Sequence, residues 1–179
     1  NVLTRSYGTH LEIMHPMAKS YVYVQLPLYF WREGMHSRSG GLDTVASRSY
    51  TDFEPYAQMK FSKGKNKFEL NYRMRVTQPE FQSLMPSDDT TDPLALRINN
   101  PDLKAITRHW LGGKATFHCD SIDLTWYAGA QTYIVRNDFG TRTTYNSQTG
   151  AYTYIDDNVD GNWDFELNGG LNGTFDKKR

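Results

Sequence analysis

Cysteine is almost absent from this chain, because its 179 residues include a single one, Cys119. An internal disulfide and any metal site built from several thiolates are therefore excluded. Long apolar runs are also missing. No stretch reaches the roughly 18 apolar residues of a membrane-spanning helix, and the opening segment NVLTRSYGTH lacks the apolar core of a signal peptide. Charge of one sign is missing too, since 20 Lys and Arg balance 20 Asp and Glu. Without a large basic field, we expect no nucleic-acid partner.

Catalytic and metal-binding signatures are equally sparse. The five histidines show no ligand spacing such as H-x-x-x-H, and no G-x-S-x-G or comparable nucleophile motif occurs. We therefore expect no enzyme, no cofactor and no metal centre. The segment 156–167 resembles a calcium loop through Asp156, Asn158 and Asp160, but its twelfth position is Leu167 and not glutamate. A turn rich in Asp, Asn and Gly is the preferred interpretation, and a weak calcium site stays open.

Aromatic residues and two-residue periodicity are what the chain does have. Aromatics make up 14% of the sequence, with 12 tyrosines, a composition typical of a folded protein. In the segment 66–76, NKFELNYRMRV, the even positions are Phe68, Leu70, Tyr72, Met74 and Val76, and the odd positions are polar or charged. Because successive side chains of a strand point to opposite faces, this pattern predicts a β-strand with one apolar and one polar face.

The same alternation recurs along the chain. It predicts an all-β fold, an antiparallel up-and-down meander of about seven strands. Those strands are expected near residues 7–13, 21–30, 53–61, 66–76, 106–117, 122–134 and 163–175. Two prolines, Pro27 and Pro55, fall inside expected strands and need local relief from pairing.

Short and long connections alternate between these strands. Tight polar turns are expected at 14–20, 62–67, 118–121 and the terminal 176–179, and long loops at 32–49, 77–104 and 136–162. All tight turns of a meander then lie at one end and all long loops at the other. Membrane barrels of the outer-membrane type have short periplasmic turns and longer extracellular loops. The aromatic residues Phe61, Phe68, Phe117 and Phe175 flank the tight turns, as in the lower aromatic girdle of such a barrel.

A soluble all-β binding module produces the same alternation with the faces exchanged. Loop asymmetry and aromatic placement favour the membrane. On that interpretation Phe68, Leu70, Tyr72, Met74 and Val76 face lipid. The residues expected to face the barrel lumen are Glu54, Gln58, Lys60, Lys67, Glu69, Arg73 and Arg75.

A loop motif adds a resemblance to a known family. The segments RVTQPEFQSLMP and DPLALRINNPDLK resemble the barrel region of Bacteroidetes-type TonB-dependent receptors and their outer-membrane β-barrel relatives. The matching positions are Arg75, Pro79, Leu84, Pro86, Asp92, Pro93, Leu94, Asn100, Pro101, Leu103 and Lys104. A later match covers Asn158, Gly161, Asn162, Trp163, Asp176, Lys177 and Lys178. Asn99 stands where the family often has Gly, and Ala105-Ile106 where it often has Pro-Glu.

The resemblance implies a bacterial outer-membrane protein that takes up nutrients as a TonB-dependent receptor. A passive barrel or adhesin stays open as an alternative. We interpret residues 1–179 as one partial barrel domain, without the plug, the N-terminal extension or the aromatic barrel C-terminus of the family. The expected partners are outer-membrane lipid, the plug and remaining barrel strands, and the TonB energy-coupling system. Because about seven strands are too few to close a plugged barrel of about 22 strands, we expect an open sheet.

Overall fold

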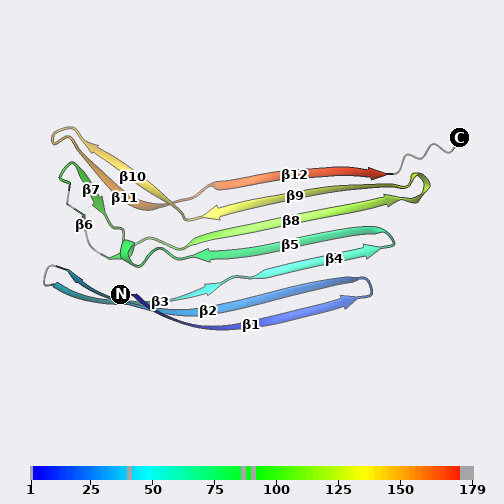
Figure 1. Ribbon diagram of the computed structural model, residues 1–179, viewed down its shortest axis with the longest axis horizontal. Coiled ribbons are helices and arrows are strands. Elements are labelled where there is room, and N and C mark those ends of the chain that lie inside the picture. Colours follow the sequence, from blue (N-terminus) through cyan, green and yellow to red (C-terminus); the bar gives the residue numbers. More distant parts are fainter. Residues whose placement is uncertain (1, 40–41, 86–87, 90–91, 174–179) are drawn as a thin grey trace.

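The computed structural model describes residues 2–39, 42–85, 88–89 and 92–173, and it is almost entirely β-structure (Figure 1). The strands are β1 (Val2–Met17), β2 (Ser20–Ser39), β3 (Leu42–Phe53), β4 (Tyr56–Lys63), β5 (Asn66–Thr77), β6 (Asp88–Asp89), β7 (Ala95–Ile98), β8 (Ile106–Cys119), β9 (Leu124–Arg136), β10 (Asp138–Asn146), β11 (Ala151–Val159) and β12 (Asn162–Gly173). Two short 3₁₀ turns are η1 (Gln82–Leu84) and η2 (Asp120–Ile122). No helix in these ranges is long and apolar enough to cross a membrane.

The main sheet is the predicted antiparallel meander. Its strands follow the order β1-β2-β4-β5-β8-β9-β12, and β3 pairs with β2 beside β4. These seven strands in sequence order are the seven that the alternation predicts. Figure 1 shows the tight turns gathered at one end of the sheet and the long connections at the other. The predicted all-β fold is therefore confirmed, and the three predicted tight turns that the structure describes lie at one end of the sheet. The predicted terminal turn at 176–179 lies outside the described residues.

Left-handed residues close the tight turns. Ala18 (φ 49°) lies between β1 and β2, Gly64 (φ 62°) between β4 and β5, and Asp123 (φ 44°) ends the η2 turn between β8 and β9. A positive φ matches the reversal that a short hairpin requires, and glycine adopts it without a Cβ penalty.

The long connections are more ordered than the sequence predicts. The expected loop 32–49 is wrong, because β2 continues to Ser39 and pairs with β3 as one long hairpin. The expected loop 136–162 is also wrong in part, since β10 and β11 form a second hairpin. In the expected loop 77–104, β6 and β7 join that hairpin in a smaller sheet of order β10-β11-β7-β6, where β7 and β11 run parallel.

The expected strand 53–61 is interrupted at Glu54 and Pro55. β3 ends at Phe53, β4 begins at Tyr56, and the two take consecutive places along β2. At the junction the Glu54 amide donates to the Pro27 carbonyl at 3.4 Å, and the Met74 amide donates to the Pro55 carbonyl at 3.0 Å. Neither proline has an amide N–H to donate to a neighbouring strand. Both lie, as predicted, at a break in regular pairing, where the partner of β2 changes from β4 to β3.

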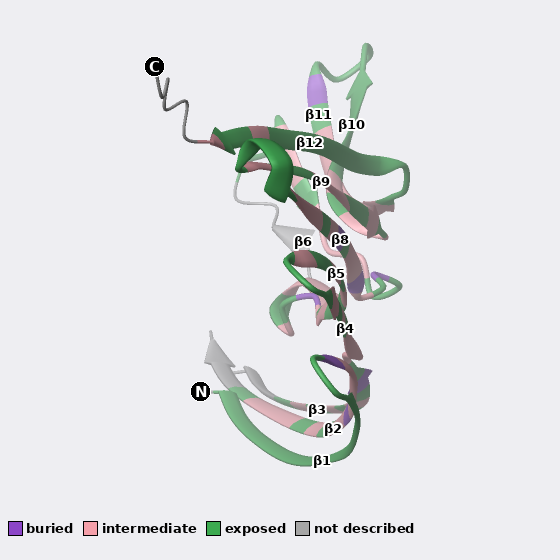
Figure 2. Ribbon diagram, turned by 90° about the vertical axis from the view of Figure 1, so that its right-hand side faces the viewer, coloured by how far each residue is buried: buried purple, intermediate pink, exposed green. Residues whose placement is uncertain are grey.

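One layer of strands makes up the main sheet. Seen from the side it is bowed, and β1 and β12 lie at its two ends without joining (Figure 2). Apart from Pro27 and Pro79, the buried apolar side chains among the described residues are Leu103, Ile106 and Ala151, all three at or near the loop end. These three residues do not form a layer over the apolar face of the main sheet, and the side chains of that face are largely exposed.

Candidate functional site

The polar face of the main sheet brings together all seven residues predicted to face the lumen. Strand register decides this, because directly opposed residues of an antiparallel pair share a face. Gln58 opposes Asn71, Lys60 opposes Glu69, and Tyr56 opposes Arg73. Lys67 continues the row of β5 and opposes Thr116, and Glu54 reaches the same face through its contact with Arg75.

Polar side-chain contacts join neighbouring strands of this face in two groups. Tyr21 donates to Gln58 Oε1 at 2.8 Å, and Gln58 Nε2 donates to Asn71 Oδ1 at 2.8 Å. Lys60 Nζ lies 3.2 Å from Glu69 Oε1. At the far side of the sheet Gln131 Nε2 donates to Glu166 Oε2 at 2.6 Å. Neither Gln131 nor Glu166 was singled out from the sequence, although both occupy polar positions of the alternation.

A hollow of about 320 Å³ lies on the polar face where β3 gives way to β4. Arg73 and Arg75 line it together with Glu54 and Tyr56. Arg75 Nη1 lies 3.6 Å from Glu54 Oε2, and the Arg73 guanidinium lies 5.6 Å from the Tyr56 ring centroid. The other Glu54 oxygen accepts the Val76 amide at 2.9 Å. The carboxylate is therefore held in place, while the side chain of Arg75 remains exposed.

The apolar face carries a continuous aromatic row at its short-turn end. Ring centroids are 6.4 Å apart for Phe61 and Phe68, 5.1 Å for Phe68 and Phe117, and 4.3 Å for Phe117 and Trp126. The row crosses β4, β5, β8 and β9. Three of its members are the aromatics predicted for a lower girdle, and Trp126 extends it. Phe175, the fourth predicted member, lies outside the described residues.

Charge is absent from the apolar face of β9 for a long distance above this row. On β9 the residues facing the same way as Trp126 are Ala128, Ala130, Thr132 and Ile134, and the next is Arg136. Ten residue steps separate Trp126 from Arg136, roughly 25 Å of height at ~3.3 Å per residue and ~40° tilt. That height matches the apolar band of a membrane barrel, about 25 Å tall.

The family model for the outer membrane protein beta-barrel family matches residues 33–178. The chain belongs to this family. Together with its two-faced sheet, this membership places the protein in the bacterial outer membrane and sets aside the soluble alternative. A search of curated proteins found no match.

Two solved structures show the same fold. The siderophore receptor PirA from Pseudomonas aeruginosa aligns with 98% of this chain and 41% of its own, at TM-score 0.54 and 11% identity. The copper transporter OprC aligns with 95% of this chain and 26% of its own, at TM-score 0.58 and 12% identity. The chain therefore spans less than half of either structure. At these identities the likeness extends to the barrel fold and not to the cargo.

Asparagine side chains hold together the loop end of this family member. Asn158 Oδ1 accepts the Lys104 amide at 2.8 Å, and Asn158 Nδ2 donates to the Lys104 carbonyl at 3.0 Å and the Asn137 carbonyl at 2.9 Å. Asn100 Nδ2 donates to the Asp156 carbonyl at 2.9 Å. Leu103 is buried beside them. The Asn-Pro-x-Leu-Lys segment, Asn100, Pro101, Leu103 and Lys104, is thus where the loop binds to β11 and enters β8.

A second set of contacts fixes the start of the same loop. Arg48 Nε donates to Glu33 Oε2 at 2.7 Å, and its Nη2 donates to the carbonyl of buried Pro79 at 2.8 Å. The guanidinium also lies 5.2 Å from the Phe81 ring centroid. Arg48 therefore joins the β2–β3 hairpin to the loop after β5. Sequence reasoning missed it, because the hairpin that carries it was expected to be a loop.

The remaining motif residues have local roles. Leu84 ends η1, and Asp92 Oδ1 accepts the Leu94 amide at 2.9 Å next to Pro93. Asn99, the departure from the common glycine, donates to the carbonyls of Gln82 at 3.0 Å and Met85 at 3.1 Å. Pro86 lies outside the described residues, as do Asp176, Lys177 and Lys178.

The calcium-like segment forms part of a strand and a turn. Asp156 and Asn158 lie in β11, and Asp160 precedes Gly161 (φ 101°) in the link to β12. Asp156 accepts the Thr141 hydroxyl at 2.9 Å, and Asp160 accepts the Asn137 amide at 2.7 Å. Asp156 thus binds a side-chain hydroxyl and Asp160 a backbone amide, in separate places. In the part of the chain that the structure describes, no three His, Cys, Asp or Glu side chains gather as metal ligands.

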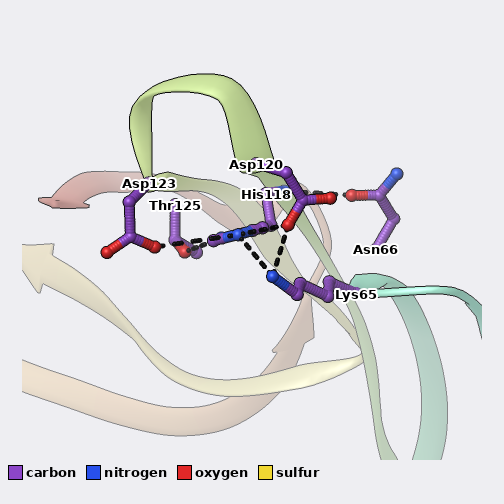
Figure 3. A network of polar contacts seen from close by, with 6 residues as sticks. All are labelled: Lys65, Asn66, His118, Asp120, Asp123 and Thr125. Atoms are coloured by element: carbon purple, nitrogen blue, oxygen red, sulfur yellow. Dashed lines mark hydrogen bonds and ion pairs between the residues drawn. The ribbon is translucent and has the colours of Figure 1, made fainter.

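At the short-turn end, a polar network joins two neighbouring turns (Figure 3). Lys65 Nζ contacts Asp120 and lies 3.0 Å from His118 Nε2, and His118 Nδ1 lies 2.8 Å from Thr125 Oγ1. Asn66 Oδ1 accepts the His118 amide at 3.0 Å. The hydrogen bond from Lys65 lowers the pKa of the Asp120 carboxyl, and the charges of Lys65 and His118 lower it further. His118, which matched no metal-ligand spacing, therefore has a role in connecting the turns.

Proposed function

We propose that this chain is barrel wall of an outer-membrane uptake receptor, with its polar face toward the lumen and its apolar face toward lipid. The observation that carries the proposal is the contrast between the faces. One face carries polar side-chain contacts that join β2, β4 and β5 through Gln58, and others that join β9 to β12 through Gln131. The other has an aromatic row and a charge-free band of membrane height. Water inside a barrel would solvate the polar face. Lipid hydrocarbon would cover the apolar face, which then needs no layer of protein over it.

The polar face suits a barrel whose lumen holds a protein plug. Charges of both signs, Lys60, Glu69, Arg73, Arg75 and Glu54, lie within a few strands, and the hollow of about 320 Å³ concentrates three of them. Such a surface can pair with the polar side chains of a plug. We therefore propose a plug and further barrel strands as partners, and energy coupling through the TonB system, as the loop-motif resemblance implies.

An uptake role is supported by the two solved neighbours that share this fold, one a siderophore receptor and the other a copper transporter. Both neighbours are more than twice as long as the part that aligns with this chain. The activity of the whole protein therefore belongs to the proposal. Residues 1–179 are then one part of a barrel domain whose remaining strands pair with β1 and β12.

Conductance of the full-length parent protein in a planar bilayer tests this function. A plugged receptor should show almost no steady ion current, because the plug fills the lumen. A passive barrel without a plug conducts ions continuously through its water-filled lumen. A stable open channel from the intact protein would contradict the receptor proposal and favour the passive alternative. It would leave the assignment of the two faces untouched.

A further inference from the structure

Two arginines face each other on the apolar side of the first hairpin. The register of β1 and β2 pairs Arg5 with Arg32, and both side chains are exposed. Among the described residues, neither guanidinium forms a hydrogen bond or ion pair. Like charges directly opposed across an antiparallel pair are destabilising, so this pair calls for an anion that the described residues do not supply.

The height of the pair identifies the environment. Below Arg32 on the same face of β2 lie Val22, Val24, Leu26, Leu28 and Phe30. From Val22 to Arg32 is again ten steps, roughly 25 Å of height at ~40° tilt, the full apolar band of a membrane barrel. Directly beneath the arginines Tyr7 opposes Phe30, an aromatic pair of the kind that lies at the headgroup level. The guanidiniums thus emerge where hydrocarbon ends at the long-loop end.

A hollow of about 310 Å³ lies at the same place, lined by Tyr7, Phe30, Arg32 and the hydroxyl residues Ser49 and Thr51. The register puts Ser49 opposite Arg32 and Thr51 opposite Phe30, so both residues belong to the lipid-facing side. Guanidinium groups bind phosphate oxygens through paired N–H donors, and hydroxyls add further hydrogen bonds. The apolar residues below offer a continuous path for acyl chains.

We propose that Arg5 and Arg32 bind the phosphate of a membrane lipid in the leaflet at the long-loop end, with its chains along Phe30, Leu28 and Leu26. This proposal rests on the proposed function only through its assignment of the apolar face to lipid. The bound phosphate neutralises the two opposed charges. It also fixes the height of the first hairpin in the membrane.

The test uses the full-length protein purified in a neutral maltoside detergent, titrated with hexadecyl phosphate. The double variant Arg5→Gln/Arg32→Gln should bind this probe at least roughly tenfold more weakly than wild type, since it loses both charged donors. Arg136→Gln is the matched control, because Arg136 lies on the same face and ends the charge-free stretch of β9, but it opposes Thr107. It should change affinity by less than about twofold, as a single arginine lacks the paired site.

Thermal melting provides a second readout that a misfolded variant cannot mimic. Without the probe, the double variant should melt at or above wild type, because the like-charge contact is gone. With saturating hexadecyl phosphate the order should reverse. Equal binding by wild type and the double variant would overturn the proposal. An equal loss in Arg136→Gln would overturn it as well, because any surface arginine would then suffice.

Two further arms separate the possible failures. Inorganic phosphate at the same concentration should not displace the probe, and displacement would assign the site to free phosphate instead of lipid. Phe30→Cys on a Cys119→Ser background, labelled with a fluorophore, should be quenched by brominated acyl chains. Quenching without selective binding overturns the lipid site alone. Absence of quenching overturns the face assignment together with the site.

Discussion

Phe117 and Trp126 stack at the short-turn end of the apolar face, with ring centroids 4.3 Å apart and planes inclined by 22°. They lie on adjacent strands in directly opposed positions. Phe68 meets Phe117 edge-on at 5.1 Å, so three neighbouring strands present rings at one height. Such a row suits the boundary between hydrocarbon and water, where aromatic side chains concentrate. It also fixes strand register at the level where each hairpin turns.

The stacked pair should be energetically coupled. A double-mutant cycle with Phe117→Ala and Trp126→Ala should give a coupling of about 0.5–1.5 kcal/mol beyond the two single losses. The free energy of unfolding in denaturant, measured with the protein in lipid vesicles, provides the values. Phe117→Ala with Leu171→Ala serves as the control, since Leu171 opposes Trp126 from β12 and lies on the far side from Phe117. A cycle that closes without coupling in the first pair would contradict the girdle.

Charge should be tolerated on one face only. Leu111→Arg places a guanidinium near the middle of the apolar band and should destabilise the protein by about 2–4 kcal/mol. Asn71→Arg lies at nearly the same height on the polar face, where Asn71 opposes Gly112, and should cost less than about 1 kcal/mol. Similar losses for both variants would be evidence against the assignment of the faces.

Acid should weaken the contact between the two short turns. Because Lys65 lowers the pKa of Asp120 in the folded protein, the carboxylate contributes stability that is present above the unfolded pKa of about 3.9. That contribution is lost as pH falls through the lower folded value. Wild type should therefore be more stable than Asp120→Asn at neutral pH, and the difference should vanish under strong acid. A difference independent of pH would contradict the ion pair.

Loss of the Arg48 contacts should release the loop that follows β5. Arg48→Gln removes the contacts to Glu33 and the Pro79 carbonyl, so chymotrypsin added to intact cells should cleave faster around Phe81 and Leu84. Arg142→Gln, on the exposed β10–β11 hairpin, is the control and should leave that rate unchanged. First cleavage beside the turn at Lys63, near Phe61 or Phe68, would reverse the proposed topology.

The strands of the main sheet could be predicted from the sequence, because a strand with lipid on one face and water on the other alternates strictly between apolar and polar residues. In β5 every second residue from Phe68 to Val76 is apolar and each residue between is polar, so both strand and faces can be assigned. In β3 the run Ala46, Ser47, Arg48, Ser49 has no such contrast, because a hairpin beyond the apolar band meets water on both faces. The hydrogen bonds between β2 and β3 therefore form without any alternation of apolar and polar residues that could predict them.

Contacts that depend on register were also beyond sequence reasoning. Arg48 and Glu33 are 15 residues apart, and Arg5 and Arg32 are 27 apart, so each pair meets only once the hairpin register is known. Lys65 and Asp120 come from different hairpins. The aromatic residues at the turns, by contrast, could be placed from sequence, because the turns themselves were recognisable.

The most direct test of the two-faced barrel wall is a cysteine scan along β5, from Lys67 to Val76, on a Cys119→Ser background in the full-length protein. Each cysteine is labelled with a fluorophore, and quenching by brominated acyl chains is compared with quenching by iodide in the water phase. We predict that positions 68, 70, 72 and 74 are quenched by the lipid and positions 67, 69, 71 and 73 are not. Lipid quenching at the second set, or equal quenching at both, would contradict the account.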